Sequence, residues 1–238
     1  MNSLTDSIDS IKKLFLQNEK FYVEELDRIA SNDGLIGFIQ AGNSDTDGWF
    51  LMLSNPGTAD WNMARLIGND IEQAKEALKL FPCFSECMLI THEKNLFFSE
   101  DLETAPNILM LEKTLLLENK GFEKTVREHN LKLSIKKRKE GIIDGCLQTA
   151  EGKLAAFVKT QRKTSNYIEL AIEVAAEHRN KGFGTFILNY VSNECLKDGF
   201  LPLYLVEKNN PQSLRIAEKC GFTIFASLKR FIYKRNLF

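Results

Sequence analysis

A glycine-containing loop between an apolar strand and a long apolar helix is the feature that most constrains this chain. Residues 168–174 have the composition of a β-strand, and the loop Arg179-Asn-Lys-Gly-Phe-Gly-Thr185 follows shortly after it. A helix begins within this loop, because apolar residues recur at helical spacing at Phe183, Phe186, Ile187, Tyr190 and Val191. A strand, a loop and a helix in this order predict an α/β arrangement for the second half of the chain.

The start of this helix predicts an anion site. The first N–H groups of a helix have no partner within it, and they lie at the positive end of its dipole. Gly182 and Gly184 let a phosphate approach the backbone, and Arg179 and Lys181 add positive charge at the rim. The loop lacks the Gly-x-x-x-x-Gly-Lys-Ser/Thr pattern of a P-loop, and Ile187 stands where a dinucleotide fingerprint needs its third glycine. The sequence therefore excludes both of those motifs.

A second pattern lies about 30 residues downstream. Asn210 suits a helix N-cap, Pro211 the first turn, and Gly221 the left-handed position after the helix. Ser213 follows three residues after the asparagine, and the pattern ends in Glu-Lys-Cys-Gly-Phe222. The loop Arg-x-x-Gly-x-Gly after a strand, followed by this second pattern, resembles the GNAT (Gcn5-related N-acetyltransferase) superfamily. The resemblance covers residues 131–238 and is best over 168–222.

This resemblance implies a mixed, mostly antiparallel sheet flanked by helices, and acetyl-CoA as co-substrate. In the family, the strand before the loop splays from its neighbour, and its free backbone pairs with the pantetheine arm. Ile172, Glu173 and Val174 take this place here, and the Val174 N–H would polarise the thioester carbonyl. The loop would hold the pyrophosphate, and Asn210 would face the cofactor. The cofactor contacts in the loop would be Arg179, Asn180, Lys181, Gly182, Phe183, Gly184 and Thr185.

The proton donor departs from the family pattern. Many members have a tyrosine seven residues after the capping asparagine, where this chain has Ala217. Tyr204 and Tyr233 are candidates from other elements. Two classes of function therefore stay open. One is an N-acetyltransferase that moves an acetyl or short acyl group to an amine by direct attack; the other is an acyl-CoA-binding module without turnover. An acyltransferase with another acyl donor or a hydroxyl acceptor is a further alternative.

The candidates for the general base are carboxylates. Glu169 and Glu173 are four residues apart on the predicted strand, so both project to one face. Glu207, at the end of the next predicted strand, is a third choice. With the Val174 N–H, Glu169 and Glu173 make up the predicted catalytic residues. His178 is interpreted as an exposed loop residue.

The first half of the chain carries no motif that indicates a function. A charged stretch at 118–130 predicts either a domain boundary or a linking helix. We expect an α/β domain over residues 1–120 and a GNAT-like acyl-CoA-binding acetyltransferase domain over 121–238. A degenerate GNAT-like half, as in two-domain relatives such as the glycine N-acyltransferases, fits the layout of the first domain. Helices are expected at 4–18, 70–80, 182–198 and 211–220, and strands at 35–41, 49–53, 86–91, 131–135, 153–160, 166–174 and 203–207, with two more within 222–233. Residues 107–117 are expected to form a long apolar strand or a buried segment.

Composition limits the partners. The 32 acidic and 31 basic residues nearly balance, which argues against nucleic acid as a partner. No apolar run reaches about 18 residues, so we expect no membrane span. Five scattered cysteines and the lack of a signal-peptide run favour the cytoplasm. Cys83 and Cys87 have no second ligand pair nearby, so no metal is expected. The expected acceptor is a small-molecule or peptide amine, and nothing in the sequence indicates an oligomeric state.

Overall fold

The chain forms two compact units in a computed structural model, which describes residues 4–31, 36–40, 49–54, 61–67, 86–92, 102–138, 141 and 143–234. The first unit combines Met1–Asn18, Glu25–Ile108 and Ala226–Phe238, and the second combines Glu19–Glu24 with Leu109–Phe225. The main division between compact units thus lies at Leu109, whereas the sequence placed a boundary near residue 120. The functional roles of the two parts stay predictions.

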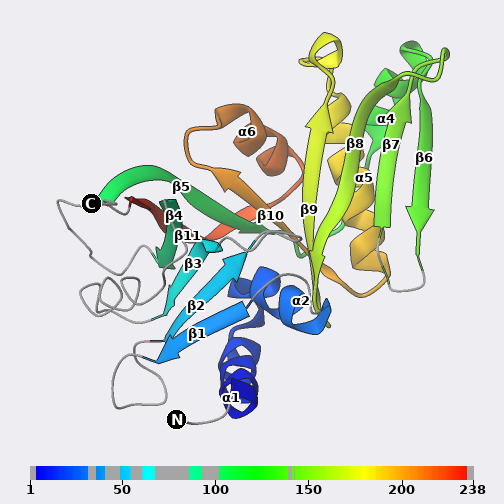
Figure 1. Cartoon of the computed structure of the whole chain (residues 1–238). Helices are drawn as coiled ribbons and strands as arrows, with labels where there is room; N and C mark the ends of the chain where they lie inside the picture. Colours follow the sequence, from blue (N-terminus) through cyan, green and yellow to red (C-terminus); the bar gives the residue numbers. More distant parts are fainter. Residues whose placement is uncertain are drawn as a thin grey trace. The chain divides into compact units, whose positions relative to one another are not determined.

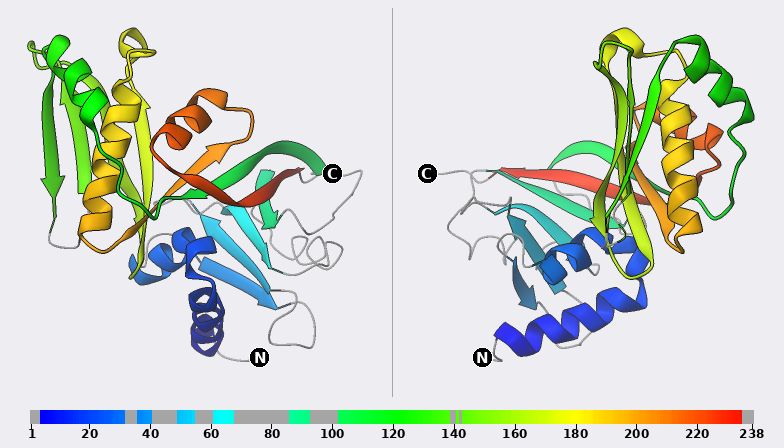
Figure 2. Two further views of the ribbon diagram at one scale, coloured as in Figure 1. Left: turned by 180° about the vertical axis from the view of Figure 1, so that it is seen from behind. Right: turned by 90° about the vertical axis from the view of Figure 1, so that its right-hand side faces the viewer.

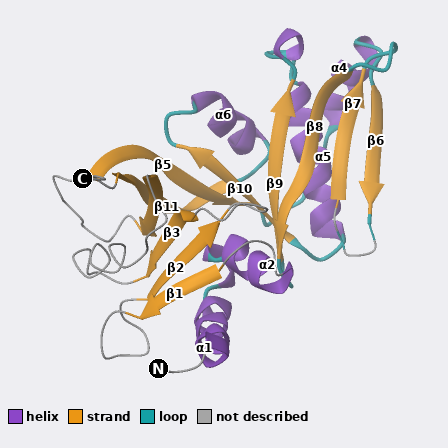
Figure 3. Cartoon of the chain, viewed as in Figure 1, coloured by secondary structure: helices purple, strands orange, loops and turns teal. Residues whose placement is uncertain are grey.

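The first unit contains helices followed by a small sheet (Figure 3). Strand β2 pairs antiparallel with β1 and β3, β3 pairs parallel with β4, and β4 pairs antiparallel with β11 (Thr223–Lys234). The positions of β1 and β2 confirm the strands expected at 35–41 and 49–53, while the helix expected at 70–80 lies outside the described residues. Sequence patterns did not predict α2 or β3. The elements are α1 (Leu4–Gln17), α2 (Val23–Ser31), β1 (Ile36–Gln40), β2 (Trp49–Ser54), β3 (Trp61–Ile67) and β4 (Glu86–His92). The 3-10 turn η1 (Glu19–Phe21) and the first residues of α2 belong to the second unit.

The second unit contains a mixed, mostly antiparallel sheet flanked by helices, as predicted (Figures 1 and 2). Its strands lie in the order β6-β7-β8-β9-β10, and only β9 and β10 are parallel. Helix α5 connects these two parallel strands, and it packs on β7, β8 and β9. The elements are α4 (Lys120–Glu128), β6 (Lys132–Lys137), β7 (Ile143–Gln148), β8 (Leu154–Lys163), β9 (Tyr167–Val174), the 3-10 turn η2 (Ala176–His178), α5 (Phe183–Lys197), β10 (Leu201–Glu207) and α6 (Pro211–Lys219).

Strand β7 escaped sequence prediction because a glycine interrupts its pattern. A Cβ atom on Gly145 would lie 2.5 Å from Val191 Cγ2 and 3.1 Å from Ile187 Cδ1, both on α5. The absent side chain therefore lets α5 approach the sheet closely. This reason for the glycine is tertiary and cannot be read from local sequence.

Two predictions about the long strands were wrong. A single strand, β11 (Thr223–Lys234), replaces the two strands expected within 222–233, because no turn residue interrupts this segment. Strand β5 (Leu102–Glu112) ends before the apolar run that was expected to continue it. Residues 113–119 have no regular structure, and Leu115 and Leu116 are 72% and 57% exposed.

A buried lysine explains the course of this irregular segment. Lys113 is fully buried, and its Nζ donates hydrogen bonds to Asn189 Oδ1, Ser192 Oγ and Asn193 Oδ1 at 2.6, 3.0 and 2.7 Å. The side-chain amides of Asn189 and Asn193 donate to the Leu117 carbonyl oxygen. These bonds hold residues 113–117 along α5. Helix α4 follows within the charged stretch 118–130, for which a linking helix was one of the two predictions.

None of the helices in the described part of the chain combines the length and apolar character of a membrane span.

Candidate functional site

Strands β9 and β10 separate after a short stretch of parallel pairing. Their register runs from Leu201 opposite Tyr167 to Tyr204 opposite Leu170. Beyond that point β9 continues to Val174 and β10 to Glu207 without pairing to each other. Figure 1 shows β10 diverging from β9 toward α6. The splay that the family resemblance implied is present.

The backbone of β9 has hydrogen-bonding groups that face this gap. The Ala175 N–H donates to the Ala155 carbonyl oxygen at 3.0 Å, so Ala175 faces β8. Residues alternate in direction along an antiparallel ladder, so the backbone groups of Ile172 and Val174 face the opposite side, from which β10 has departed. The carbonyl of Val174 accepts a 3.3 Å hydrogen bond from Arg179 Nε, which agrees with this direction.

The loop after β9 brings the start of α5 to the same gap. Asn180 and Gly182 have φ angles of 61° and 82°, in the left-handed region, where glycine is favoured and asparagine is tolerated. Gly182 is the N-cap of α5, and its carbonyl accepts the first helical hydrogen bond, from the Phe186 N–H. The N–H groups of residues 183–185 therefore have no partner within the helix, as predicted for an anion site.

Helix α6 forms the other wall. Asn210 is its N-cap, with Oδ1 accepting from the Ser213 N–H at 3.1 Å, as the sequence predicted. A Cβ atom on Gly184 would lie 3.1 Å from both Ile216 Cδ1 and Val174 Cγ2. The absent side chain at Gly184 thus lets α5, α6 and the end of β9 meet around one space.

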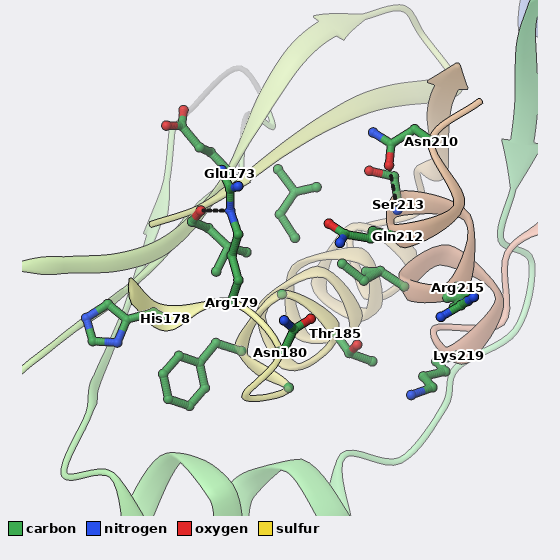
Figure 4. Close-up of a pocket in the computed structure, with 16 residues that line it drawn as sticks. Glu173, His178, Arg179, Asn180, Thr185, Asn210, Gln212, Ser213, Arg215 and Lys219 are labelled. Atoms are coloured by element: carbon green, nitrogen blue, oxygen red, sulfur yellow. Dashed lines mark hydrogen bonds between the residues drawn. The ribbon is translucent and has the colours of Figure 1, made fainter. Parts of the chain in front are cut away.

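These elements enclose a pocket of about 510 Å³ (Figure 4). This volume is within the range of roughly 300–1,000 Å³ typical of small-molecule sites. Lys181 and Glu169 do not line it, although the sequence proposed both as site residues. The predicted residues that line it are Ile172, Glu173, Val174, Arg179, Asn180, Gly182, Phe183, Gly184, Thr185 and Asn210.

Sequence reasoning missed six pocket residues. His178 lines the pocket beside Phe183, with ring centroids 5.8 Å apart, although it was interpreted as an exposed loop residue. The other five project from α6. These five residues recur at intervals of three to four along the predicted helix. This spacing could have identified them, because it places them along one helix face. They are Gln212, Ser213, Arg215, Ile216 and Lys219.

The two candidate bases have different surroundings. Glu173 is exposed and lines the pocket, and its carboxylate points away from the α6 residues (Figure 4). Glu169 is buried, lies opposite Arg162 in the β8–β9 register, and does not line the pocket. Of the two carboxylates, only Glu173 can meet a ligand in this pocket.

The family position of the tyrosine supplies no hydroxyl, because it is occupied by Ala217, which is fully buried in the core of the second unit. Tyr204, on β10, is also buried, and its hydroxyl interacts with the side chain of the pocket residue Ser213. Burial raises the pKa of Tyr204, and the nearby Ser213 side chain opposes this rise. The side chain of Tyr233, the other candidate, lies outside the described residues.

Metal-ligating side chains do not cluster in the described part of the chain, where no group of three or more His, Cys, Asp or Glu could hold an ion. Cys83 lies outside the described residues, as does the side chain of Cys87. The absence of a metal site at these cysteines stays a prediction.

Comparison with known proteins agrees with this geometry. The family model described as "Acetyltransferase (GNAT) family" matches residues 112–222. Curated protein sequences yield no match to the chain. Residues 112–222 are thus a domain of the GNAT acetyltransferase family.

Solved structures resemble the chain over most of its length. A GCN5-related N-acetyltransferase from Kribbella flavida has a TM-score of 0.58 at 12% identity, covering 88% of this chain and 96% of its own. A GCN5-related N-acetyltransferase-like protein from Streptococcus suis has a TM-score of 0.55 at 12% identity, with 85% and 89% covered. A GNAT-family acetyltransferase from Colwellia psychrerythraea has a TM-score of 0.52 at 14% identity, with 98% of each chain covered. These likenesses show the GNAT fold.

Proposed function

We propose that this protein transfers an acetyl or short acyl group from coenzyme A to an amine. The observation that carries the proposal is the gap between β9 and β10, where backbone groups of Ile172 and Val174 that do not pair with β10 lie beside the start of α5. The pantetheine arm resembles a peptide and can pair with such a strand edge. The N–H groups at the start of the helix suit the pyrophosphate. The acceptor class, a small-molecule or peptide amine, rests on the family alone.

Acyl transfer in this pocket requires an N–H donor and a base. As the amine nitrogen bonds to the thioester carbon, negative charge develops on the carbonyl oxygen, and the Val174 N–H would stabilise it. Glu173 would accept the proton that the attacking ammonium must lose, directly or through water. Collapse of the intermediate breaks the carbon–sulfur bond and releases the coenzyme A thiolate. Tyr204, beside the pocket residue Ser213, would supply the proton that this thiolate takes up.

Direct attack is favoured over a covalent cysteine intermediate. Burial raises the pKa of both Cys195 and Cys220 to about 12, so neither thiol supplies a thiolate near neutral pH. Both side chains are fully buried. Neither cysteine is therefore suited to act as a nucleophile.

A second candidate function is an acyl-CoA-binding module without turnover. The observation that favours it is Ala217, which removes the usual tyrosine hydroxyl from the family position. A thiolate is a good leaving group and does not strictly need an acid, so we rank transfer first. An acyltransferase with another acyl donor, such as a glycine N-acyltransferase-like enzyme, is compatible with the same pocket.

Release of the coenzyme A thiol from acetyl-CoA, measured across amines, amino acids and peptides, tests the proposal. We expect amine-dependent release, and we expect Glu173→Gln to lower kcat about a hundredfold. The matched control is Glu177→Gln, which makes the same substitution at an exposed residue that does not line the pocket. This variant should keep the wild-type rate. If no acceptor promotes release while acetyl-CoA still raises the melting temperature, the protein is a binding module instead.

A further inference from the structure

Two cations line the pocket on α6 and have no role in the chemistry described above. Arg215 and Lys219 are four residues apart on the same face of the helix, and both are exposed. Figure 4 shows them together on α6, across the pocket from Glu173. In the described part of the chain we find no ion pair or side-chain hydrogen bond for either group.

The helix itself does not explain this pair. A lysine in the last turn is favourable near the negative end of the helix dipole, which is a sufficient structural reason for Lys219. Arg215 lies in the middle of the helix and gains nothing from that effect. Like charges at a spacing of four residues destabilise a helix by roughly 0.2–0.5 kcal/mol. An anionic ligand would compensate this repulsion.

The pair lies close to the predicted pyrophosphate site but on a different helix. The Cys220 thiol, next to Lys219, contacts the Thr185 carbonyl oxygen at 3.3 Å, which joins the end of α6 to the first turn of α5. The pocket therefore has three regions of different polarity. Unpaired strand backbone lies at β9, helix N–H groups lie at the start of α5, and two cations lie on α6.

This order of polarity matches the order of groups in coenzyme A. The pantetheine arm is uncharged and hydrogen-bonding, the pyrophosphate follows it, and the ribose carries a separate 3′-phosphate. A pyrophosphate held by the N–H groups at the start of α5 would leave the α6 cations available for a second phosphate. An arginine is well suited to a phosphate, because its guanidinium donates two parallel hydrogen bonds.

We propose that Arg215 and Lys219 form a subsite for the 3′-phosphate of coenzyme A, so that the protein discriminates coenzyme A from its 3′-dephospho form. This inference rests on the proposed coenzyme A site and adds a determinant of donor specificity to it. It also sets the direction of the ligand, with the thioester toward β9 and the phosphorylated ribose toward the end of α6.

Calorimetric titration of the full chain with coenzyme A and with 3′-dephospho-coenzyme A tests the subsite. We expect wild type to bind coenzyme A about tenfold more tightly than the dephospho compound, as charge-assisted bonds to partly solvated cations allow. This preference should shrink at high salt. The double variant Arg215→Gln/Lys219→Gln should bind both compounds equally, with an unchanged Kd for the dephospho compound.

The control and the contrary outcomes are distinct. Lys132→Gln removes an exposed charge from β6, outside the pocket lining, and should keep the tenfold preference. Equal binding of both compounds by wild type would overturn the subsite and leave the proposed function intact. If neither compound binds, the proposed function fails and the subsite fails with it. If the double variant loses affinity equally for both compounds, the cations contact a part that the two compounds share, which would contradict a 3′-phosphate site.

Discussion

Replacing Gly184 with leucine is expected to raise the Kd for coenzyme A about a hundredfold or more, as measured by calorimetry. Gly184 is the second residue of α5, where the pocket walls meet. Its Cβ alone would lie 3.1 Å from Ile216 Cδ1 and from Val174 Cγ2. A leucine side chain must displace these walls or fill the pocket, and it shields the helix N–H groups that would face the pyrophosphate.

The matched control for this variant is Gly121→Leu. Gly121 also lies in a helix near its start, but it is exposed, and a Cβ there would meet nothing within 4 Å. The control should keep wild-type affinity, and both variants should keep the far-ultraviolet circular dichroism of the wild type. Wild-type affinity in a folded Gly184→Leu protein would show that coenzyme A binds elsewhere.

Lys113→Ala is expected to lower the free energy of unfolding by about 3 kcal/mol at neutral pH, measured by urea denaturation. The side chain fills a fully buried site and donates to three acceptors on α5. Truncation leaves a cavity, and the side-chain oxygen Asn189 Oδ1 loses the hydrogen bond that the lysine donates. A loss below about 0.5 kcal/mol, the size of an ordinary surface substitution, would contradict this role for Lys113.

The same lysine should make stability rise with pH. Burial lowers its pKa from 10.5 to about 8, and the nearby Cys220 and Cys195 side chains partly oppose this shift. Below pH 8 the ammonium is charged in both states, so the folded state carries the full cost of burying it. Between about pH 8 and 10.5 the folded protein loses the proton first, and stability should rise by about 3 kcal/mol in total.

Two other groups at this site titrate in the opposite direction. The pKa values of Cys195 and Cys220 are raised by burial to about 12, so these thiols lower stability as pH rises above their ordinary value of 9. The neighbouring Asn189, Ser192 and Asn193 are neutral. Comparing wild type with Lys113→Met, which keeps much of the buried volume, isolates the lysine. The rise should be absent from the variant, and identical pH profiles would refute the assignment.

Local backbone chemistry explains why much of the site could be predicted from sequence. The cap at Asn210, the left-handed conformation of Gly221 and the apolar face of α5 all depend on residues close in the chain. Each has a physical requirement that a single residue type meets. The mixed, mostly antiparallel sheet then followed from the family resemblance, and the strand pairing confirms it.

The features that escaped prediction depend on contacts distant in sequence. Gly145 interrupts the pattern of β7 only because α5 lies above it. The apolar run at 115–117 was expected in a strand, but the burial of Lys113 against α5 ends the strand and leaves these leucines exposed. Arg215 reads as an ordinary surface residue until α6 is placed beside the start of α5.

Amide hydrogen exchange with and without acetyl-CoA tests the central claim most directly, because it reports both binding and its location. We expect acetyl-CoA to slow exchange at Ile172 and Val174, at the free end of β9, and at the N–H groups of residues 183–185. Glu173, whose amide pairs with β8, should change less. Protection confined to other segments, or none at saturating acetyl-CoA, would contradict a coenzyme A site between β9 and β10.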